Sequence, residues 1–242
     1  MKIYQHILQA ISQGKRVLAV LMDPDKMQVD NVKSFIEKVN KTKADYLFVG
    51  GSIVNEKATE ALVSKIKKYT QLPVVIFPGD VTQITDNADA LLFLSLISGR
   101  NSDYLIGKHV EAAKRLQNTN LEVIPTGYIL IENGKQTSVE KVSHTKPMSR
   151  ENVQRIVDTA NAGELLGMKL IYLEAGSGAL HPVSEEIIKS VKQALSIPLI
   201  VGGGIRTLEK LELAYDSGAD VVVIGTAFEE DESFFDKLKR ES

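Results

Sequence analysis

Acidic side chains directly follow two apolar runs that we expect to be buried strands. Asp23 and Asp25 come after residues 17–22, and Glu174 comes after residues 169–173. Carboxylate oxygens are ligands that Mg²⁺ prefers, so the first pair indicates a site for this cation, with an ordinary helix-capping Asp-Pro turn as the alternative. A carboxylate at the position of Glu174 can act as general base on a substrate hydroxyl, and a structural ion pair is the alternative.

Two glycines and a serine follow another apolar run, residues 46–49. Gly50 and Gly51 allow the backbone to approach a ligand closely. The Ser52 hydroxyl is suited to a metal, a phosphate or the N-terminus of a helix. The alternative is a flexible turn in which Ser52 only caps the following helix.

Glycine-rich loops near the carboxyl terminus indicate a phosphate site. Gly202, Gly203 and Gly204 stand in succession, and Gly225-Thr226 follows the last apolar run. Barrels often bind phosphate with the loops after strands seven and eight and a nearby helix N-terminus. The small residues 175–178 after Glu174 can also wrap their backbone N–H groups around an anion. We favour phosphate binding by the two glycine loops together over ordinary turns.

A regular alternation of strands and helices must position these residues. Short apolar runs, typical of parallel strands buried on both faces, alternate with amphipathic stretches. The predicted strands are residues 17–22, 46–49, 74–77, 90–96, 121–126, 169–173, 199–202 and 221–224. The predicted helices include residues 29–40, 56–68, 103–117, 150–166, 185–195 and 208–217. This order predicts an α/β protein of the (β/α)8 TIM-barrel type, with a doubly wound sheet as the alternative.

Two connections depart from a regular barrel. Residues 79–89, between the third and fourth strands, are too few for a crossover helix with its turns. We therefore expect an extended segment in place of the third helix, and a lateral gap that can become a groove. Residues 127–147 form a long polar connection after the fifth strand, and their pattern predicts a hairpin-like flap over the barrel mouth.

Composition restricts the class of protein. The 242 residues fit a single barrel domain spanning residues 1–242, and a 43% hydrophobic content is ordinary for a protein with a sizeable core. The net charge of −2 gives no basic surplus for a nucleic-acid partner. Without cysteines and with only four histidines, a disulfide framework is excluded and a zinc site is not expected. We expect a cytoplasmic protein, because neither a signal peptide nor a membrane-spanning run is evident.

Together these motifs resemble one family over essentially the whole chain. They are Asp23-Pro24, Gly50-Gly51-Ser52, Phe77-Pro78-Gly79, residues 92–101, Thr126-Gly127-Tyr128, residues 172–178 and the two glycine loops. Each motif is common, but their order is specific. The chain resembles geranylgeranylglyceryl phosphate synthases, including bacterial relatives, whose modified (β/α)8 barrel lacks the third helix.

The resemblance implies a Mg²⁺-dependent prenyl transfer. The C3 hydroxyl of sn-glycerol 1-phosphate would attack C1 of a prenyl diphosphate, geranylgeranyl diphosphate in the family, to give an ether and pyrophosphate. Asp23 and Ser52 match the family's Mg²⁺ positions. The residues that match its glycerol phosphate site are Tyr172, Leu173, Glu174, Ala175, Gly176, Ser177, Gly178, Gly203, Gly204, Gly225 and Thr226. Many relatives have asparagine in place of Thr226, so a backbone contact would survive here and a side-chain amide contact would not.

Four further expectations concern the reacting groups and the prenyl tail. Glu174 would accept the hydroxyl proton, and the π-face of Tyr128 would stabilise positive charge on the allylic carbons. The tail would lie in the gap left by the missing helix, between residues 92–97 and 104–106, where burial contributes about 0.8 kcal/mol per CH₂. Tyr104 is a candidate plug that limits tail length.

Two other functions remain open from the sequence. Another phosphate-binding barrel, such as a phosphosugar isomerase, would share the glycine loops but would not need Mg²⁺. A non-catalytic prenyl phosphate carrier would not need a base beside its metal. The resemblance also implies a homo-oligomer, a dimer or a hexamer, while prenyl length is left undetermined.

Overall fold

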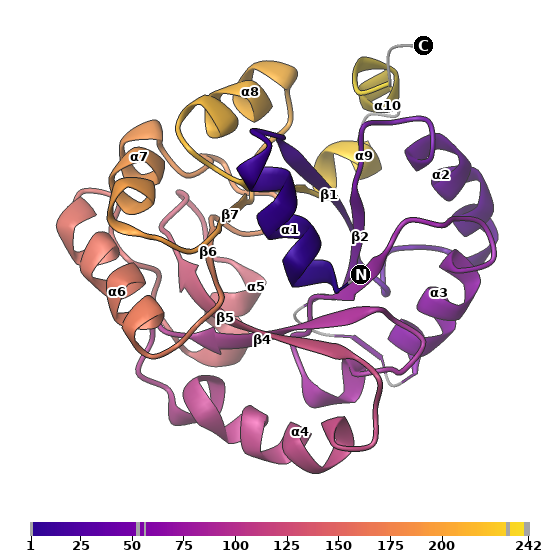
Figure 1. Cartoon of the computed structure of the whole chain (residues 1–242), viewed down its shortest axis with the longest axis horizontal. Coiled ribbons are helices and arrows are strands. Elements are labelled where there is room, and N and C mark those ends of the chain that lie inside the picture. Colours follow the sequence, from indigo (N-terminus) through magenta and orange to yellow (C-terminus); the bar gives the residue numbers. More distant parts are fainter. Residues whose placement is uncertain (1, 52–53, 56, 231–232, 240–242) are drawn as a thin grey trace.

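The computed structural model describes residues 2–51, 54–55, 57–230 and 233–239. Eight strands close into a parallel barrel in the order β1 to β8, and β1 pairs with β8 (Figure 1). The strands are β1 (Val17–Met22), β2 (Tyr46–Val49), β3 (Val74–Ile76), β4 (Ala90–Leu96), β5 (Glu122–Leu130), β6 (Leu170–Glu174), β7 (Leu199–Gly202) and β8 (Val221–Ile224). The predicted barrel is confirmed, and all eight predicted strands are present with bounds that differ mainly at β5.

The barrel interior is packed with side chains and closed at one end. Tyr46, Phe48, Leu92 and Tyr172 belong to the buried cluster inside the barrel. Helix α1 (Ile3–Ser12), which the sequence pattern did not predict, lies across the centre of the ring (Figure 1) and adds apolar side chains to that cluster. The carboxylate of Glu122, at the start of β5, accepts hydrogen bonds from the first N–H groups of α1. Because α1 covers the amino ends of the strands, the open mouth is at their carboxyl ends.

The outer helices pack around the barrel over a second buried apolar cluster. They are α2 (Val32–Val39), α3 (Ala58–Ile66), α4 (Lys108–Leu116), α6 (Val153–Leu165), α7 (Glu185–Ala194) and α8 (Leu208–Asp216). All six predicted helical segments are therefore present, with shorter ends. Residues 29–31 form a separate 3₁₀ turn (η1, Val29–Asn31), and α4 is preceded by a π-helical turn (η3, Asp103–Gly107).

The connection between β3 and β4 contains no α-helix. Its regular structure is a single 3₁₀ turn, η2 (Val81–Gln83), for which the Asp80 side chain accepts a hydrogen bond of 3.1 Å from the Thr82 N–H. The third helix of a regular barrel would follow β3, whereas α3 lies between β2 and β3. The prediction that the helix after β3 is replaced is therefore confirmed. The outer face of β4 is consequently covered by η2 and α4 instead of by a complete pair of helices.

The predicted hairpin after β5 is wrong. Helix α5 (Ser138–Ser143) occupies this connection, and the Thr137 hydroxyl caps it by accepting a hydrogen bond of 3.1 Å from the Glu140 N–H. A hairpin needs a free strand edge, but β4 and β6 already pair with the two edges of β5. The returning chain instead makes a single parallel bridge between Ile131 and Met148.

Two short helices, α9 (Thr226–Glu230) and α10 (Ser233–Lys237), complete the chain after β8. Phe228 and Phe235 pack there against Phe35 of α2, with ring centroids 6.4 and 5.2 Å from that of Phe35.

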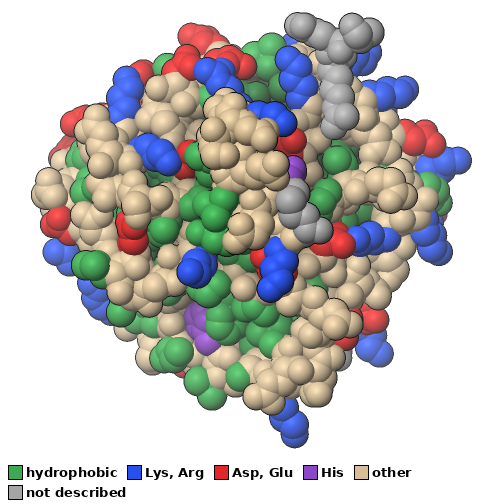
Figure 2. Space-filling model, in the orientation of Figure 1, with side chains coloured by type: hydrophobic (Ala, Val, Ile, Leu, Met, Phe, Trp, Pro, Cys, Tyr) green, Lys and Arg blue, Asp and Glu red, His purple; other side chains and the backbone are tan. Residues whose placement is uncertain are grey.

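On the face of the molecule that carries α1, acidic and basic side chains alternate around the rim (Figure 2). Within the described ranges, the helices are too short or too polar to cross a membrane.

Candidate active site

The carboxyl ends of the strands and the start of α5 surround one polar cavity. Predicted site residues that line it are Asp23, Tyr128, Tyr172, Glu174, Gly176, Ser177, Gly203, Gly204, Gly225 and Thr226. They come from the ends of β1, β5, β6, β7 and β8, or directly follow them. Parallel strands bring all their carboxyl ends to one side, which explains why residues 200 positions apart meet.

Glu174 is the most deeply buried carboxylate in this cavity. It is the last residue of β6, and its side chain is 5% exposed. Its Oε1 accepts a hydrogen bond of 2.5 Å from the Gly176 N–H. Burial raises the pKa of Glu174 to about 7, although that hydrogen bond acts in the opposite direction. A carboxylate with this pKa is suited to accept a proton near neutral pH.

Three aromatic rings stand beside Glu174. The ring centroids of Phe77 and Tyr128 are 5.9 Å apart, and the Tyr172 centroid lies 5.3 Å from that of Phe77 and 5.4 Å from that of Tyr128. The buried Tyr172 hydroxyl lies beside the Glu174 carboxylate, and its interaction with that carboxylate acts to lower the pKa of Glu174. The rings give this side of the cavity an apolar, π-rich wall.

Glycines allow the phosphate loops to approach Glu174. Gly203 and Gly204 have φ angles of +86° and +73°, in the left-handed region that favours glycine. A Cβ at position 203 would lie 2.5 Å from Oε1 of Glu174 and 2.6 Å from the Gly176 nitrogen. The triple-glycine motif is thus required by close contact between the loops after β6 and β7. The two loops therefore pack directly against each other at the cavity wall.

Hydroxyl and cationic groups gather on the side of the cavity formed by the loops after β6 and β8. The Ser177 and Thr226 hydroxyl oxygens are 3.3 Å apart, and α9 begins at Thr226. The ammonium group of Lys26 lies 3.4 Å from the Ser177 oxygen, and Arg206 also lines the cavity. Sequence analysis gave Lys26 and Arg206 no role. Their positions in the sequence, beside the Asp23 turn and the glycine run, could have indicated this role, because cations next to anion-binding loops neutralise phosphate.

The remaining predicted glycerol phosphate residues lie around this cavity without lining it. The side chains of Leu173 and Ala175 pack in the outer core, because alternate residues of β6 face the helices. The Ala175 N–H donates a hydrogen bond of 3.0 Å to the Gly202 carbonyl. Gly178 is next to the cationic groups, since a Cβ there would lie 3.0 Å from Nζ of Lys135 and 3.8 Å from a guanidinium nitrogen of Arg206.

Asp23 lines the same cavity as Glu174. Its side chain is 25% exposed, and burial raises its pKa above the ordinary value. A Cβ on Gly51 would lie 2.9 Å from Oδ1 of Asp23, so the carboxylate packs against the loop that leads to Ser52. Ser52 itself lies outside the described residues. Asp25 turns away and accepts hydrogen bonds of 3.1 Å from Asn55, so it is not the second carboxylate that the Asp-Pro turn had suggested.

The protein offers few ligands for a Mg²⁺ ion at Asp23. The described ranges contain no cluster of three or more histidine, cysteine or acidic side chains that could enclose a metal. Mg²⁺ is usually bound by one or two carboxylates together with waters and substrate phosphates. A single inward-facing carboxylate beside a phosphate cavity therefore fits this cation when a diphosphate supplies further oxygens.

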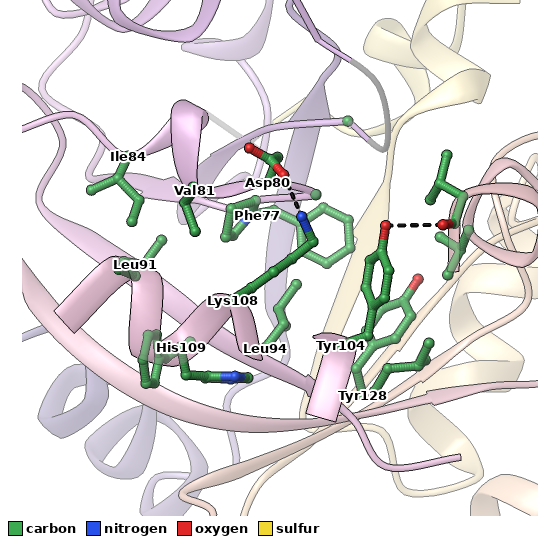
Figure 3. A pocket seen from close by; sticks show the side chains of 18 residues that line it. Phe77, Asp80, Val81, Ile84, Leu91, Leu94, Tyr104, Lys108, His109 and Tyr128 are labelled. Carbon is green, nitrogen blue, oxygen red and sulfur yellow. Dashed lines mark hydrogen bonds and ion pairs between the residues drawn. The ribbon is translucent and has the colours of Figure 1, made fainter. Parts of the chain in front are cut away.

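An apolar groove extends from the polar cavity into the space left by the missing helix (Figure 3). Gly51, Phe77, Tyr128 and Val139 line both the cavity and the groove, which are therefore continuous. The outer part of the groove is lined by Val81, Ile84, Leu91, Phe93, Leu94, Leu96, Tyr104, His109 and Ala112. The predicted position of the groove is confirmed.

Some residues expected at the groove lie elsewhere. Leu92 faces the barrel interior, Ile97 packs in the outer core, and Ile106 is exposed. Arg100, which follows β4, is also exposed, and its guanidinium hydrogen-bonds the carbonyl groups of Ile97 and Gly99. Leu92 alternates with Leu91 and Phe93, which line the groove, so its side chain points to the opposite face of the sheet.

Fold and site together define a class of protein. A buried carboxylate of raised pKa, an anion-binding wall and a continuous apolar groove belong to a (β/α)8-barrel enzyme that handles a phosphorylated substrate together with an apolar chain. Residues 11–241 match the PcrB family, and the chain belongs to this family.

Named relatives match over nearly their full length. A geranylgeranylglyceryl phosphate synthase of Flavobacterium johnsoniae is 56% identical over 97% of this chain and 96% of its own. A synthase of the same name from Pyrococcus abyssi is 37% identical over 99% of this chain and 94% of its own. Among solved structures, the (S)-3-O-geranylgeranylglyceryl phosphate synthase of Thermoplasma acidophilum, in complex with its substrate sn-glycerol-1-phosphate, superposes with a TM-score of 0.92. It is 33% identical, covering 98% of this chain and 96% of that one.

Proposed function

We propose that this protein is a prenyltransferase that joins the C3 hydroxyl of sn-glycerol 1-phosphate to geranylgeranyl diphosphate. The products are geranylgeranylglyceryl phosphate and pyrophosphate. The observation that carries the proposal is the continuity of the polar cavity around Glu174 with the apolar groove beside β4. The activities for which the relatives are named and the substrate bound to the Thermoplasma protein support the same reaction.

In this proposal, each end of the reaction is assigned to particular groups of the cavity. The loops at Gly176, Gly203 and Thr226 hold the glycerol phosphate, with Lys26 and Arg206 as nearby cations. Glu174 accepts the proton of the C3 hydroxyl as this oxygen bonds to C1 of the prenyl group. The bond between C1 and the diphosphate oxygen breaks, and pyrophosphate leaves with the bonding electrons. Fixed placement of the attacking oxygen lowers the entropic part of the barrier.

Asp23 and Ser52 are the residues that would hold Mg²⁺. The cation, when bound, would stabilise the negative charge that develops on the leaving diphosphate. Asp23 contributes its carboxylate from the side of the cavity nearest Gly51, where the groove begins. A diphosphate bound there would have its prenyl chain directed toward Phe77 and Tyr128, because these side chains line both compartments.

The aromatic wall supports a role for Tyr128 in the transfer. Its ring is 5% exposed and lies between the Glu174 cavity and the groove, where C1 of the prenyl group would react. The face of an aromatic ring attracts positive charge, and charge develops on the allylic carbons as the diphosphate leaves. We assign this role to the ring of Tyr128 and not to its hydroxyl.

The apolar groove disfavours one alternative and the buried carboxylate disfavours the other. A phosphosugar isomerase has no use for an apolar groove of this kind next to its reacting carbons. A prenyl phosphate carrier would use the groove but has no use for a buried carboxylate whose pKa lies near 7. We therefore retain the transferase. Its assembly as a dimer or hexamer and its place in the cytoplasm remain predictions, and light scattering of the purified protein would settle the first.

The test is direct. The purified protein is incubated with Mg²⁺, geranylgeranyl diphosphate and one enantiomer of glycerol phosphate, and the ether product is measured by mass spectrometry. We expect product from sn-glycerol 1-phosphate and its loss with EDTA. Absence of product from both enantiomers at every prenyl length would reject the transferase. Isomerase activity or prenyl diphosphate binding without pyrophosphate release would then identify the alternatives.

A further inference from the structure

A charged pair crosses the apolar groove. Lys108, in the first turn of α4, forms an ion pair with Asp80, which precedes η2 in the connection between β3 and β4. Both side chains line the groove, whose other lining residues are mainly apolar. In Figure 3 they meet between Ile84 and Leu91 on one side and Tyr104 and Tyr128 on the other. The pair thus connects the two walls that replace the missing helix.

Tyr104 continues this connection to the mouth of the barrel. The Lys108 ammonium lies 5.2 Å from the centroid of the Tyr104 ring, within range of a cation–π interaction. The Tyr104 hydroxyl donates a hydrogen bond of 3.1 Å to the carbonyl of Val142 in α5 (Figure 3). We call Asp80, Lys108 and Tyr104 together the strap. Its contacts run without interruption from the β3–β4 connection through α4 and η3 to α5.

The strap is arranged to cover an apolar ligand while keeping its charges at the surface. The Lys108 side chain is 27% exposed and that of Asp80 is 37% exposed, so the charged ends reach water while the lysine methylenes face the groove. Burial alone would raise the pKa of Asp80, but hydrogen bonds from Lys108 and Thr82 bring it below the ordinary value. Both partners therefore carry their charges at neutral pH.

The strap also divides the groove by distance from the reacting centre. Gly51, Phe77, Tyr128 and Val139 form the inner part, because they also line the Glu174 cavity. Ile84, Leu91, His109 and Ala112 belong to the part that the polar cavity does not reach. A short prenyl chain attached to a diphosphate at Asp23 would fill the inner part alone. A longer chain would have to pass the strap.

We propose that the strap is a specificity-determining element that closes over long prenyl tails and favours them over short ones. The inference rests on the proposed prenyl transfer and adds residues that the reacting groups do not touch. A tail that extends past the strap gains the cover of the Lys108 methylenes and of the ring of Tyr104. A tail that ends before it gains nothing from the ion pair.

The test compares two substrates in one variant. Lys108→Met keeps an apolar side chain of similar length but removes the ion pair and the cation–π contact. We expect the ratio of kcat/KM for geranylgeranyl over geranyl diphosphate to fall about fivefold, the factor that corresponds to about 1 kcal/mol, the upper value for an exposed pair. Lys108→Arg, which keeps the charge, should restore most of the ratio. High salt should lower the ratio in the unmodified protein and not in Lys108→Met.

A matched control separates this effect from a general loss of charge. Lys67 and Asp89 form an ion pair of similar exposure, 35% and 36%, at a position that does not line the groove. Lys67→Met should leave the substrate ratio within about twofold of the unmodified value, as surface changes usually do. An unchanged ratio in Lys108→Met, or equal losses with both substrates, would overturn the proposal. Failure of the unmodified protein to form ether from any prenyl diphosphate would instead reject the proposed function.

Discussion

Replacing Glu174 by glutamine should abolish activity and stabilise the protein at the same time. The substitution keeps the shape of the side chain and an oxygen that can accept the hydrogen bond from the Gly176 N–H. It removes the ability to accept a proton and also removes the buried negative charge. Because these losses act on different properties, one variant tests both the assigned role and the electrostatics of the site.

The magnitudes follow from the pKa. General base catalysis contributes about 10²–10⁴-fold, so the rate of ether formation should fall by a factor in this range. Burial raises the pKa of Glu174 from 4.5 to about 7. The folded state therefore binds this proton more tightly than the unfolded state does. The stability that results is complete below pH 4.5 and is lost as the pH rises through about 7, a loss of about 3 kcal/mol by pH 8.

A glutamine at position 174 does not ionise, so the variant does not lose this stability as the pH rises. At pH 8 the free energy of unfolding of Glu174→Gln should exceed that of the unmodified protein by about 3 kcal/mol, and at pH 5 by about 1 kcal/mol or less. Urea unfolding at both pH values measures the difference. Ether formation from pH 5.5 to 8.5 gives the pH profile, in which kcat/KM of the unmodified protein should rise to a plateau above about pH 7. Glu151→Gln, a change of the same kind at an exposed position, serves as the control for both measurements.

Three results would refute this reasoning. Retention of more than about a tenth of the activity by Glu174→Gln would exclude Glu174 as the general base. A stability difference that is the same at pH 5 and pH 8 would show that the carboxyl group does not have a raised pKa in the folded protein. A profile without a pH dependence between 5.5 and 8.5 would contradict both arguments.

Three further predictions concern other parts of the site. Gly203→Ala, which places a methyl group 2.5 Å from Oε1 of Glu174, should raise the KM for glycerol phosphate at least about tenfold and lower the unfolding temperature; unchanged kinetics would contradict the close contact. Asp23→Asn should lower kcat by about 100-fold at saturating Mg²⁺, measured by pyrophosphate release, and an unaltered Mg²⁺ titration would remove Asp23 from the metal site. Tyr128→Phe should keep most of the turnover if the ring face stabilises charge, so an inactive but folded variant would show that the hydroxyl is needed.

The barrel itself was predictable because its signals are local. Apolar runs of strand length recur through the chain, and the structure places strands at residues 17–22, 46–49, 90–96, 199–202 and 221–224 as expected. The absence of a helix between β3 and β4 could be predicted from the number of residues in this connection alone, because a helical crossover requires more. The glycine loops were recognisable because a left-handed φ at Gly203 and Gly204 restricts the residue type.

The errors arose where tertiary contacts override local pattern. The segment after β5 has the alternation of a hairpin, but both edges of β5 are occupied, so it forms α5. The role of helix α1 depends on the open amino end of the barrel and on Glu122, which lies more than 100 positions away. Asp25 looked equivalent to Asp23 in the sequence, yet its carboxylate accepts a hydrogen bond from the side chain of Asn55.

The sequence by itself determined which residue types stand after which strand, and therefore which groups could share one barrel mouth. Tertiary structure decided what those groups can do. The pKa of Glu174 depends on burial by several strands, and the contact of Ser177 with Thr226 joins loops 49 positions apart. The strap likewise exists only because the missing helix lets Asp80 reach Lys108 across the groove. Residue identity is local information, whereas desolvation and the spacing of charges are properties of the folded surroundings.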